Sequence, residues 1–207
     1  MSDHAPVDDE VEDDPLEDIP DWDDEYIDRV SDRILHSYDL ERNRRVEGQQ
    51  FTLYGSLEVE RRKAFIHPSL TYGNHNITEH LFVRRADAVA VRDFEQLVDL
   101  GETLSEEWID ADEEHYQTEF VFGLVVPEIP DDVREFVSGF ESRNLINYGY
   151  YGHYSIRLFV VAPDTEDAVA SPETDVVRAF RLWDDGERKE KSDGVLGRLR
   201  AAFSRRS

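Results

Sequence analysis

Two of the seven histidines share the same short context, in which a glutamate directly precedes the histidine. These pairs, Glu79-His80 and Glu114-His115, each lie at the start of a predicted strand. If the two strands are neighbours in a sheet, two imidazoles and two carboxylates meet at one edge, a ligand set that suits zinc, manganese or non-haem iron. Neither pair has the spacing of a known motif such as His-Glu-x-x-His, so the alternative is local hydrogen bonding at a sheet edge or in a loop.

Other catalytic arrangements have little support in the sequence. The chain contains no cysteine, which excludes disulfides, thiolate nucleophiles and cysteine-based metal sites. The segment Val137–Phe140 (Val-Ser-Gly-Phe) lacks the nucleophile-elbow pattern, and no Ser-His-Asp arrangement can be assigned. The 48 acidic residues are so numerous that proximity of any two assigns no general acid or base. We therefore expect no cofactor other than a divalent metal held by the two Glu-His pairs.

The C-terminal segment Gly194–Ser207 differs in charge from the rest of the chain, with four arginines and no acidic residue. Its apolar residues recur at helical spacing, which predicts a short basic amphipathic helix. Such a helix is typical of a docking segment, and three surfaces are open to it: the protein's own acidic surface, a groove of a partner protein and an anionic lipid headgroup layer. The residues expected to dock are Val195, Leu196, Arg198, Leu199, Arg200 and Phe203.

Aromatic residues alternate with glycines in Asn147–Tyr154, Asn-Tyr-Gly-Tyr-Tyr-Gly-His-Tyr. This composition favours a packed loop that covers a sheet end, and the alternative is a surface on which rings or bases stack. A formal net charge of −25 repels nucleic acid, so we do not expect a nucleic-acid partner.

The same charge suggests the solvent in which the protein works. Only three of the 23 basic residues are lysines, and the apolar residues are too many and too periodic for a disordered acidic chain. A folded, acidic, lysine-poor surface fits a cytoplasm of molar salt, where a Debye length of about 3 Å screens self-repulsion. The alternative is an acidic surface aimed at a basic partner. The acidic N-terminus is unlike a signal peptide, and no apolar run approaches the roughly 20 residues of a membrane span, so we expect a cytoplasmic protein.

The first half of the chain predicts a helix followed by a small antiparallel unit. The helix begins near Asp21 or Asp23 and ends near His36–Asp39, before a polar turn at Arg42–Gly48. Period-two alternation over Phe51–Glu60 predicts a half-buried strand. The remaining elements are a returning strand at Ala64–His67, a loop at Thr71–Thr78 and a third strand at His80–Arg85.

The second half predicts a strand-helix-strand unit after a long amphipathic helix over Val91–Trp108. The strands are Phe120–Val126, apolar on both faces and therefore central, and Ile156–Val161, with a helix at Asp131–Phe140 between them. A last helix is predicted at Glu173–Trp183. The fold class is α/β or α+β, with a mixed sheet of about five strands, an N-terminal helix, a hairpin, the long helix and the terminal strand-helix-strand unit.

These elements define the expected domain organisation. Residues 21–183 should form a single α/β domain, preceded by an acidic disordered tail over residues 1–20. A charged linker over residues 184–193 should join the domain to the basic amphipathic helix of residues 194–207.

Several segments resemble a family of short haloarchaeal proteins, a domain of unknown function. They are Asp21–Asp28 (DWDDEYID), Trp108–His115 (WIDADEEH), Val126–Phe140 (VPEIPDDVREFVSGF) and Tyr148–Tyr154 (YGYYGHY). The resemblance covers most of the predicted domain. It implies a soluble, cytoplasmic and halophilic protein, and it implies no activity.

The order helix, three strands, helix, strand, helix, strand also resembles the core of the restriction-endonuclease-like superfamily. In active members the third strand carries an acidic residue and a lysine two positions apart, and these groups help to hold a divalent metal and activate water. With Gln96 of the following helix as the reference, those positions are Phe82 and Arg84 here. Neither can play the expected part, because a phenyl ring does not ligate metal and arginine does not deprotonate. The resemblance therefore implies a catalytically inactive relative.

Taken together, these features favour a non-catalytic interaction or adaptor module that docks through its basic C-terminal helix onto a protein partner or a membrane surface. The alternatives are a metal-dependent hydrolase that uses the Glu-His pairs, and a degenerate nuclease-like protein that handles nucleic acid.

Overall fold

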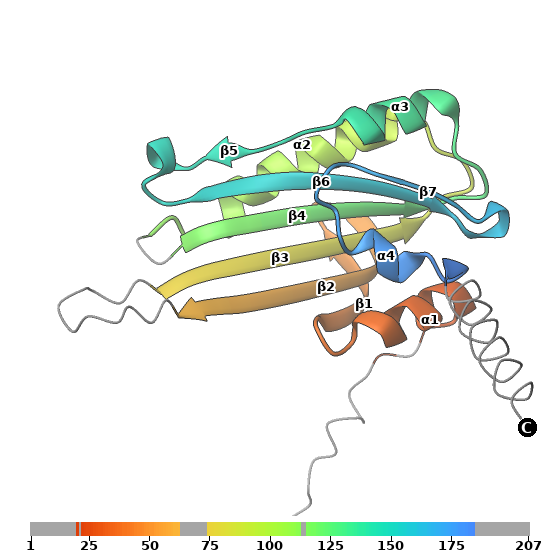
Figure 1. Ribbon diagram of the computed structural model, residues 1–207, viewed down its shortest axis with the longest axis horizontal. Coiled ribbons are helices and arrows are strands. Elements are labelled where there is room, and N and C mark those ends of the chain that lie inside the picture. Colours follow the sequence, from red (N-terminus) through yellow and green to blue (C-terminus); the bar gives the residue numbers. More distant parts are fainter. Residues whose placement is uncertain (1–19, 21, 63–73, 113–114, 185–207) are drawn as a thin grey trace, which may run out of the picture.

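A computed structural model describes residue 20 and residues 22–62, 74–112 and 115–184. The expected acidic tail, most of the charged linker and the basic C-terminal helix lie outside these residues. The described part is a sheet with helices on both faces (Figure 1). Its elements in chain order are α1 Glu25–Ile34, β1 Asp39–Val46, β2 Gln49–Arg62, β3 Asn74–Arg85, α2 Val91–Trp108, β4 His115–Val125, α3 Asp131–Gly139, β5 Asn144–Leu145, β6 His153–Ala162, β7 Asp167–Ala170 and α4 Val177–Phe180.

The sheet is mixed, as predicted, and has seven strands in the described residues rather than about five. Strands β1, β2 and β3 form an antiparallel meander, while β3, β4 and β6 run parallel. The short strands β5 and β7 pair antiparallel with opposite ends of β6. The α/β fold class is therefore confirmed. None of the described helices is long and apolar enough to cross a membrane.

The first strand was not predicted, because the sequence of β1 has no hydrophobic period. It is an edge strand whose side chains are mostly exposed, with only Val46 buried. Glu47 and Gly48 join it to β2, and both have positive φ, 46° and 76°, as in the tight turns that connect twisted antiparallel strands. The predicted turn at Arg42–Gly48 is wrong except for these last two residues.

The third strand begins earlier than predicted. Strand β3 starts at Asn74 and pairs with β2 from Arg62 onward, so the second half of the predicted loop Thr71–Thr78 is strand. Turn-forming asparagines here are accommodated by backbone pairing with β2 on one side and β4 on the other. The predicted returning strand Ala64–His67 lies outside the described residues.

Helices α2 and α3 cover one face of the sheet, and α1 and α4 cover the other (Figure 1). Residues alternate between the two cores along each central strand. In β4, Phe120 and Phe122 face α2 whereas Val121 faces α1, as the apolar run on both parities predicted. Gly101 of α2 permits close packing on β6, since a Cβ atom there would lie 2.8 Å from Ile156.

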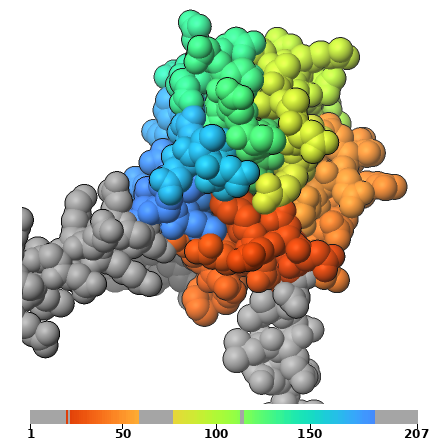
Figure 2. Space-filling view, turned by 90° about the vertical axis from the view of Figure 1, so that its right-hand side faces the viewer, coloured from red at the N-terminus to blue at the C-terminus, as the bar shows by residue number. Residues whose placement is uncertain are grey.

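Helices α1 and α4 lie side by side on the second face, as the red and blue segments of Figure 2 show. The cap of α1 is Asp24 rather than Asp21 or Asp23, and its carboxylate accepts from the backbone N–H groups of Tyr26 and Ile27. The Tyr26 hydroxyl then donates to the carbonyl of Phe180 at 2.6 Å. Helix α4 is one turn long, shorter than the predicted helix at Glu173–Trp183.

Candidate binding site

A cavity of about 440 Å³ lies on the α2 face of the sheet, where the amino ends of β3 and β4 meet the carboxyl end of α2. We call it the His80 cavity. Its volume is in the range of small-molecule sites. The residues that line it are Arg44, Tyr54, Glu58, Thr78, His80, Trp108, Ile109, Asp110, Asp112, His115 and Thr118.

The wall of the cavity is an assembly of rings contributed by four elements. Strand register places Tyr54 of β2, His80 of β3 and Phe120 of β4 close together on one face. Trp108, the last residue of α2, meets His80 edge-on at a centroid distance of 5.1 Å and Tyr54 at 6.4 Å. His80 stacks on Phe120 at 5.5 Å. Such ring pairs contribute about 0.5–1.5 kcal/mol each beyond area burial, so these contacts stabilise the wall.

A guanidinium group already occupies part of this wall. The Cζ atom of Arg44 lies 4.0 Å from the ring centroid of Tyr54 and 5.3 Å from that of Trp108. Its Nη1 atom also forms an ion pair with Glu41 at 2.6 Å. The ring faces therefore bind a cation in this structure, and the cation comes from the protein's own edge strand.

His80 is neutral at pH 7. Burial, reinforced by the positive charge of Arg44, lowers its pKa to about 4. Its Nδ1 atom lies 2.8 Å from the Tyr54 hydroxyl, which fixes the ring. His80 thus adds a polar group and no charge to the cavity.

The charged groups of the cavity favour cations. Among the described lining residues, the carboxylates of Glu58, Asp110 and Asp112 outnumber the single guanidinium of Arg44. The carboxyl end of α2 also points here, and the last turn of this helix contains no basic residue. The negative end of a helix dipole attracts positive charge. The carboxylates and the helix end therefore both favour a positively charged ligand.

His115 is held at the rim. Its Nδ1 atom lies 2.6 Å from the carbonyl oxygen of Tyr151, and because a carbonyl only accepts, Nδ1 carries the proton. Its Nε2 atom lies 2.9 Å from the Thr118 hydroxyl. The backbone N–H of His115 donates to Asp112 at 2.9 Å. Both ring nitrogens therefore have partners within the protein.

The structure brings together two of the four residues proposed as metal ligands. His80 and His115 line the same cavity, but the Glu79 carboxylate accepts from Tyr38, at 2.6 Å, in the core on the opposite face. Adjacent strand residues point to opposite faces, so Glu79 does not join His80. Glu114 lies outside the described residues. In the described part of the chain, no group of three or more His, Cys, Asp or Glu side chains could hold a metal ion.

Phe82 and Arg84, the positions compared with nuclease catalytic residues, make contacts within the fold. Phe82 is fully buried and stacks on Phe122 with ring centroids 5.0 Å apart. Arg84 donates to the side chain of Gln49 at 2.9 Å. The described elements follow the order helix, three strands, helix, strand, but the first of these strands, β1, was not predicted and the predicted strand Ala64–His67 lies outside the described residues.

The aromatic segment Asn147–Tyr154 is divided between packing and exposure. Tyr154 packs against the α2 core and donates to Glu102. In contrast, Tyr148 and Tyr150 are 93% and 82% exposed. The six residues of the predicted C-terminal docking face lie outside the described residues.

Sequence reasoning missed Arg44, Tyr54 and Trp108 as site residues. Arg44 belongs to a strand with no hydrophobic period, and Trp108 fits the apolar face of its helix equally well as a core residue. One signal was available: a helix that ends in Glu-Glu-Trp, with no basic residue in its last turn, leaves a negative end next to an aromatic ring.

These features define an α/β domain with a ring-walled, acidic cavity at the amino edge of its parallel strands. The chain belongs to the family described as Domain of unknown function (DUF8052), whose model matches residues 23–182. Comparisons with curated proteins and with solved structures find no match to this chain.

Proposed function

We propose that this protein is a non-catalytic interaction module whose His80 cavity receives a guanidinium or ammonium group from a partner protein. The observation that carries the proposal is the position of Arg44, whose guanidinium lies 4.0 Å above the Tyr54 ring at the edge of the cavity. The site thus already accommodates the chemical group that we propose as its ligand.

The composition of the cavity supports a cation over an anion. Three carboxylates and a helix carboxyl end lie against one guanidinium, and that guanidinium is itself paired with Glu41. A cation over an aromatic face gains about 0.5–2 kcal/mol, depending on desolvation. This contact depends on short-range geometry and therefore weakens less in salt than a long-range charge attraction.

In this proposal the net charge of −25 is an adaptation to the solvent, because a Debye length of about 3 Å in molar salt screens long-range attraction to a partner. Adaptation to molar salt in the cytoplasm of a haloarchaeon is part of the proposal. The free energy of unfolding should then rise steeply with KCl concentration. A protein equally stable in dilute buffer would contradict the halophilic part and leave the cavity proposal standing.

The basic segment of residues 194–207 is the second contact element that we propose. At molar salt its apolar face must supply most of the affinity, so Leu199→Asp should weaken partner retention more than Arg200→Gln. A pull-down with the full chain in molar KCl, followed by mass spectrometry, measures this. The reverse order of the two variants would contradict docking through the apolar face.

The cation proposal is tested with L-argininamide as the probe. The full chain is titrated while the indole N–H signal of Trp108, identified with Trp108→Phe, is followed by nuclear magnetic resonance. We expect a saturable shift that is weakened in Asp110→Asn, because one of three cavity carboxylates is lost.

The matched control is Glu128→Gln, which removes one exposed carboxylate beyond the carboxyl end of β4, the end away from the cavity. This variant should bind the probe as the unmodified protein does. Equal weakening in Asp110→Asn and Glu128→Gln would show that the probe responds only to overall acidity. A titration without saturation would overturn the proposal.

A metal-dependent hydrolase is the second candidate, favoured by one observation: His80 and His115 line the same cavity. Its test is the metal content of the purified protein compared with that of His80→Ala. Stoichiometric metal that is lost in the variant would favour the hydrolase over the cation site.

A further inference from the structure

A second cavity, of about 390 Å³, lies at the edge of β6 that is turned away from β4. We call it the Arg157 cavity. Strand β5 covers only His153 and Tyr154 of this edge, and β7 covers Phe159–Ala162. The residues that line the cavity are Glu141, Ser142, Arg143, Arg157, Pro172 and Glu173.

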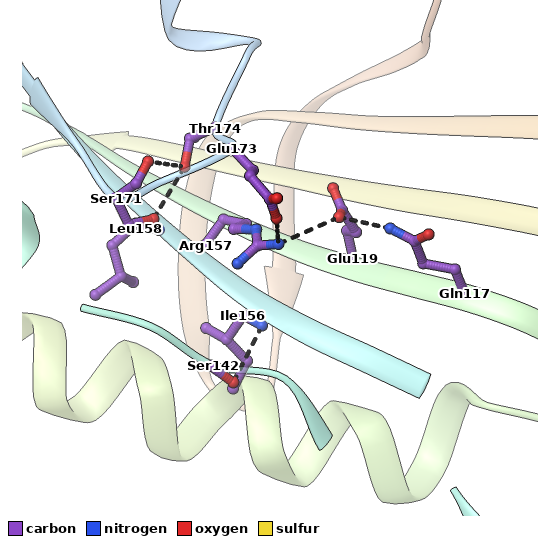
Figure 3. Close-up of polar contacts among 9 residues, drawn as sticks. All are labelled: Gln117, Glu119, Ser142, Ile156, Arg157, Leu158, Ser171, Glu173 and Thr174. Atoms are coloured by element: carbon purple, nitrogen blue, oxygen red, sulfur yellow. Dashed lines mark hydrogen bonds and ion pairs between the residues drawn. The ribbon is translucent and has the colours of Figure 1, made fainter. Parts of the chain in front are cut away.

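Side chains replace strand pairing in the gap between β5 and β7. The Ser142 hydroxyl accepts from the backbone N–H of Ile156 at 3.4 Å, and the Ser171 hydroxyl accepts from that of Leu158 at 3.0 Å (Figure 3). The two segments that carry these serines form the sides of the cavity. The edge of β6 is thereby covered without a continuous neighbouring strand.

Arg157 forms the base of the cavity and is buried, with a side chain 9% exposed. Its Nη2 atom lies 2.7 Å from Glu173 and 3.8 Å from Glu119, and Figure 3 shows the guanidinium between these two carboxylates. The Nε atom of Arg157 and the hydroxyl oxygen of Ser155 are buried and have no hydrogen-bond partner among the described residues. Burying a cation is unfavourable unless its donors are paired. Because Nε lacks a partner in the described part of the chain, the two carboxylates leave the Arg157 guanidinium incompletely satisfied.

Glu173 is poorly suited to be a permanent partner. Its side chain is 79% exposed, and an exposed carboxylate gains little from an ion pair because water competes for both groups. Its φ of 63° is unusual for a residue other than glycine, so the contact is made from a strained backbone. The Glu173 carboxylate therefore covers Arg157 in a way that a more highly charged anion can displace.

We propose that the Arg157 cavity binds a phosphoryl group, either inorganic phosphate or the phosphate of a small monoester. The anion replaces the Glu173 carboxylate on Nη2 of Arg157 and gains the exposed Arg143 as a second cation at the rim. Arginine suits this role because its planar donors match phosphate oxygens. A dianion is favoured over a single carboxylate, because it must compete with the glutamates that also line the cavity. This site is separate from the His80 cavity and goes beyond the cation-binding function.

The first test compares phosphate binding by the full chain and by Glu173→Gln, measured by calorimetry at constant ionic strength with chloride as the background anion. Glutamine keeps the size of the side chain and removes the competing charge. We expect Glu173→Gln to bind phosphate about fivefold tighter. The same titration with methyl phosphate shows whether a monoester is accepted as well as the free ion. Failure of both anions to bind Glu173→Gln would overturn the proposal.

The second test uses two exposed arginines, which avoids unfolding caused by loss of the buried Arg157. In the Glu173→Gln background, Arg143→Gln should weaken phosphate binding about fivefold. Arg178→Gln is the matched control, because Arg178 is 79% exposed in its side chain and does not line the cavity. Equal losses in the two variants would mean non-specific attraction of phosphate and would overturn the site.

Discussion

The His80 cavity and the Arg157 cavity differ in charge and are alike in construction. The His80 cavity has ring walls and an excess of carboxylates, and a guanidinium of the chain lies against it. The Arg157 cavity has a buried guanidinium at its base, and a carboxylate of the chain covers it. In each case a side chain of the protein already makes the kind of contact that we propose for the ligand.

The two internal occupants differ in how firmly they are held. Arg44 contacts two rings and forms an ion pair with Glu41. Glu173 is exposed and reaches Arg157 from a backbone with positive φ. The comparison teaches that displacement should be easy at the Arg157 cavity, whereas a ligand of the His80 cavity should bind beside Arg44 rather than in place of it.

The largest expected effect concerns the ring wall of the His80 cavity. Trp108→Ala removes contacts with the rings of Tyr54 and His80 and should lower the free energy of unfolding by about 3 kcal/mol. Tyr148→Ala, at a tyrosine 93% exposed, should change it by less than about 0.5 kcal/mol. Chemical denaturation of both variants checks this. Similar losses would mean that the ring wall contributes little to the stability of the fold.

The second prediction concerns acid stability through His80. Its folded-state pKa of about 4 lies below the ordinary value of 6.5, so the unfolded chain takes up this proton first as the pH falls. The stability contributed by neutral His80 is complete above pH 6.5 and is lost between pH 6.5 and 4, by about 2 kcal/mol after solvent screening. The free energy of unfolding of His80→Gln, measured by chemical denaturation, should therefore change less with pH over this range. An unchanged pH profile would contradict a neutral, half-buried His80.

The adjacent Glu79 should show the opposite pH dependence. Burial is the main cause that raises the pKa of its carboxyl group, so the charged form costs stability at pH 7, and this cost is relieved as the pH falls toward the ordinary value. Glu79→Gln should therefore raise the free energy of unfolding at pH 7, by less than the Trp108 effect, and the gain should shrink on acidification. A gain that grows at low pH would contradict this sign.

The sequence could predict the buried strands of the sheet but not its exposed edge. The apolar runs that form β4 and β6 were predictable because both faces are buried. Strand β1 was not, since an edge strand with exposed side chains shows no hydrophobic period. That Glu79 and His80 face opposite cores follows from strand alternation, once β3 is known to include both residues.

The cavities themselves depend on tertiary register. Arg44 meets Tyr54 and Trp108 only because the β1–β2 pairing and the length of α2 bring them to the same edge. The Arg157 cavity lies where β5 and β7 leave a gap along β6, and no local pattern reveals this gap. Single-sequence reasoning identifies strands and helices, and it cannot identify pairs of residues whose proximity depends on how those elements align.

The smallest expected effect separates the two features of Glu173. Glu173→Gln removes the ion pair with Arg157 and keeps the strained backbone, whereas Glu173→Gly removes both, since glycine adopts positive φ readily. If strain is stored at this residue, Glu173→Gly should be more stable than Glu173→Gln by about 1 kcal/mol, as measured by chemical denaturation. A less stable glycine variant would mean that the loop favours this conformation without strain. Glu173 would then be a firmer occupant of the Arg157 cavity, and the two occupants would differ less than their exposure suggests.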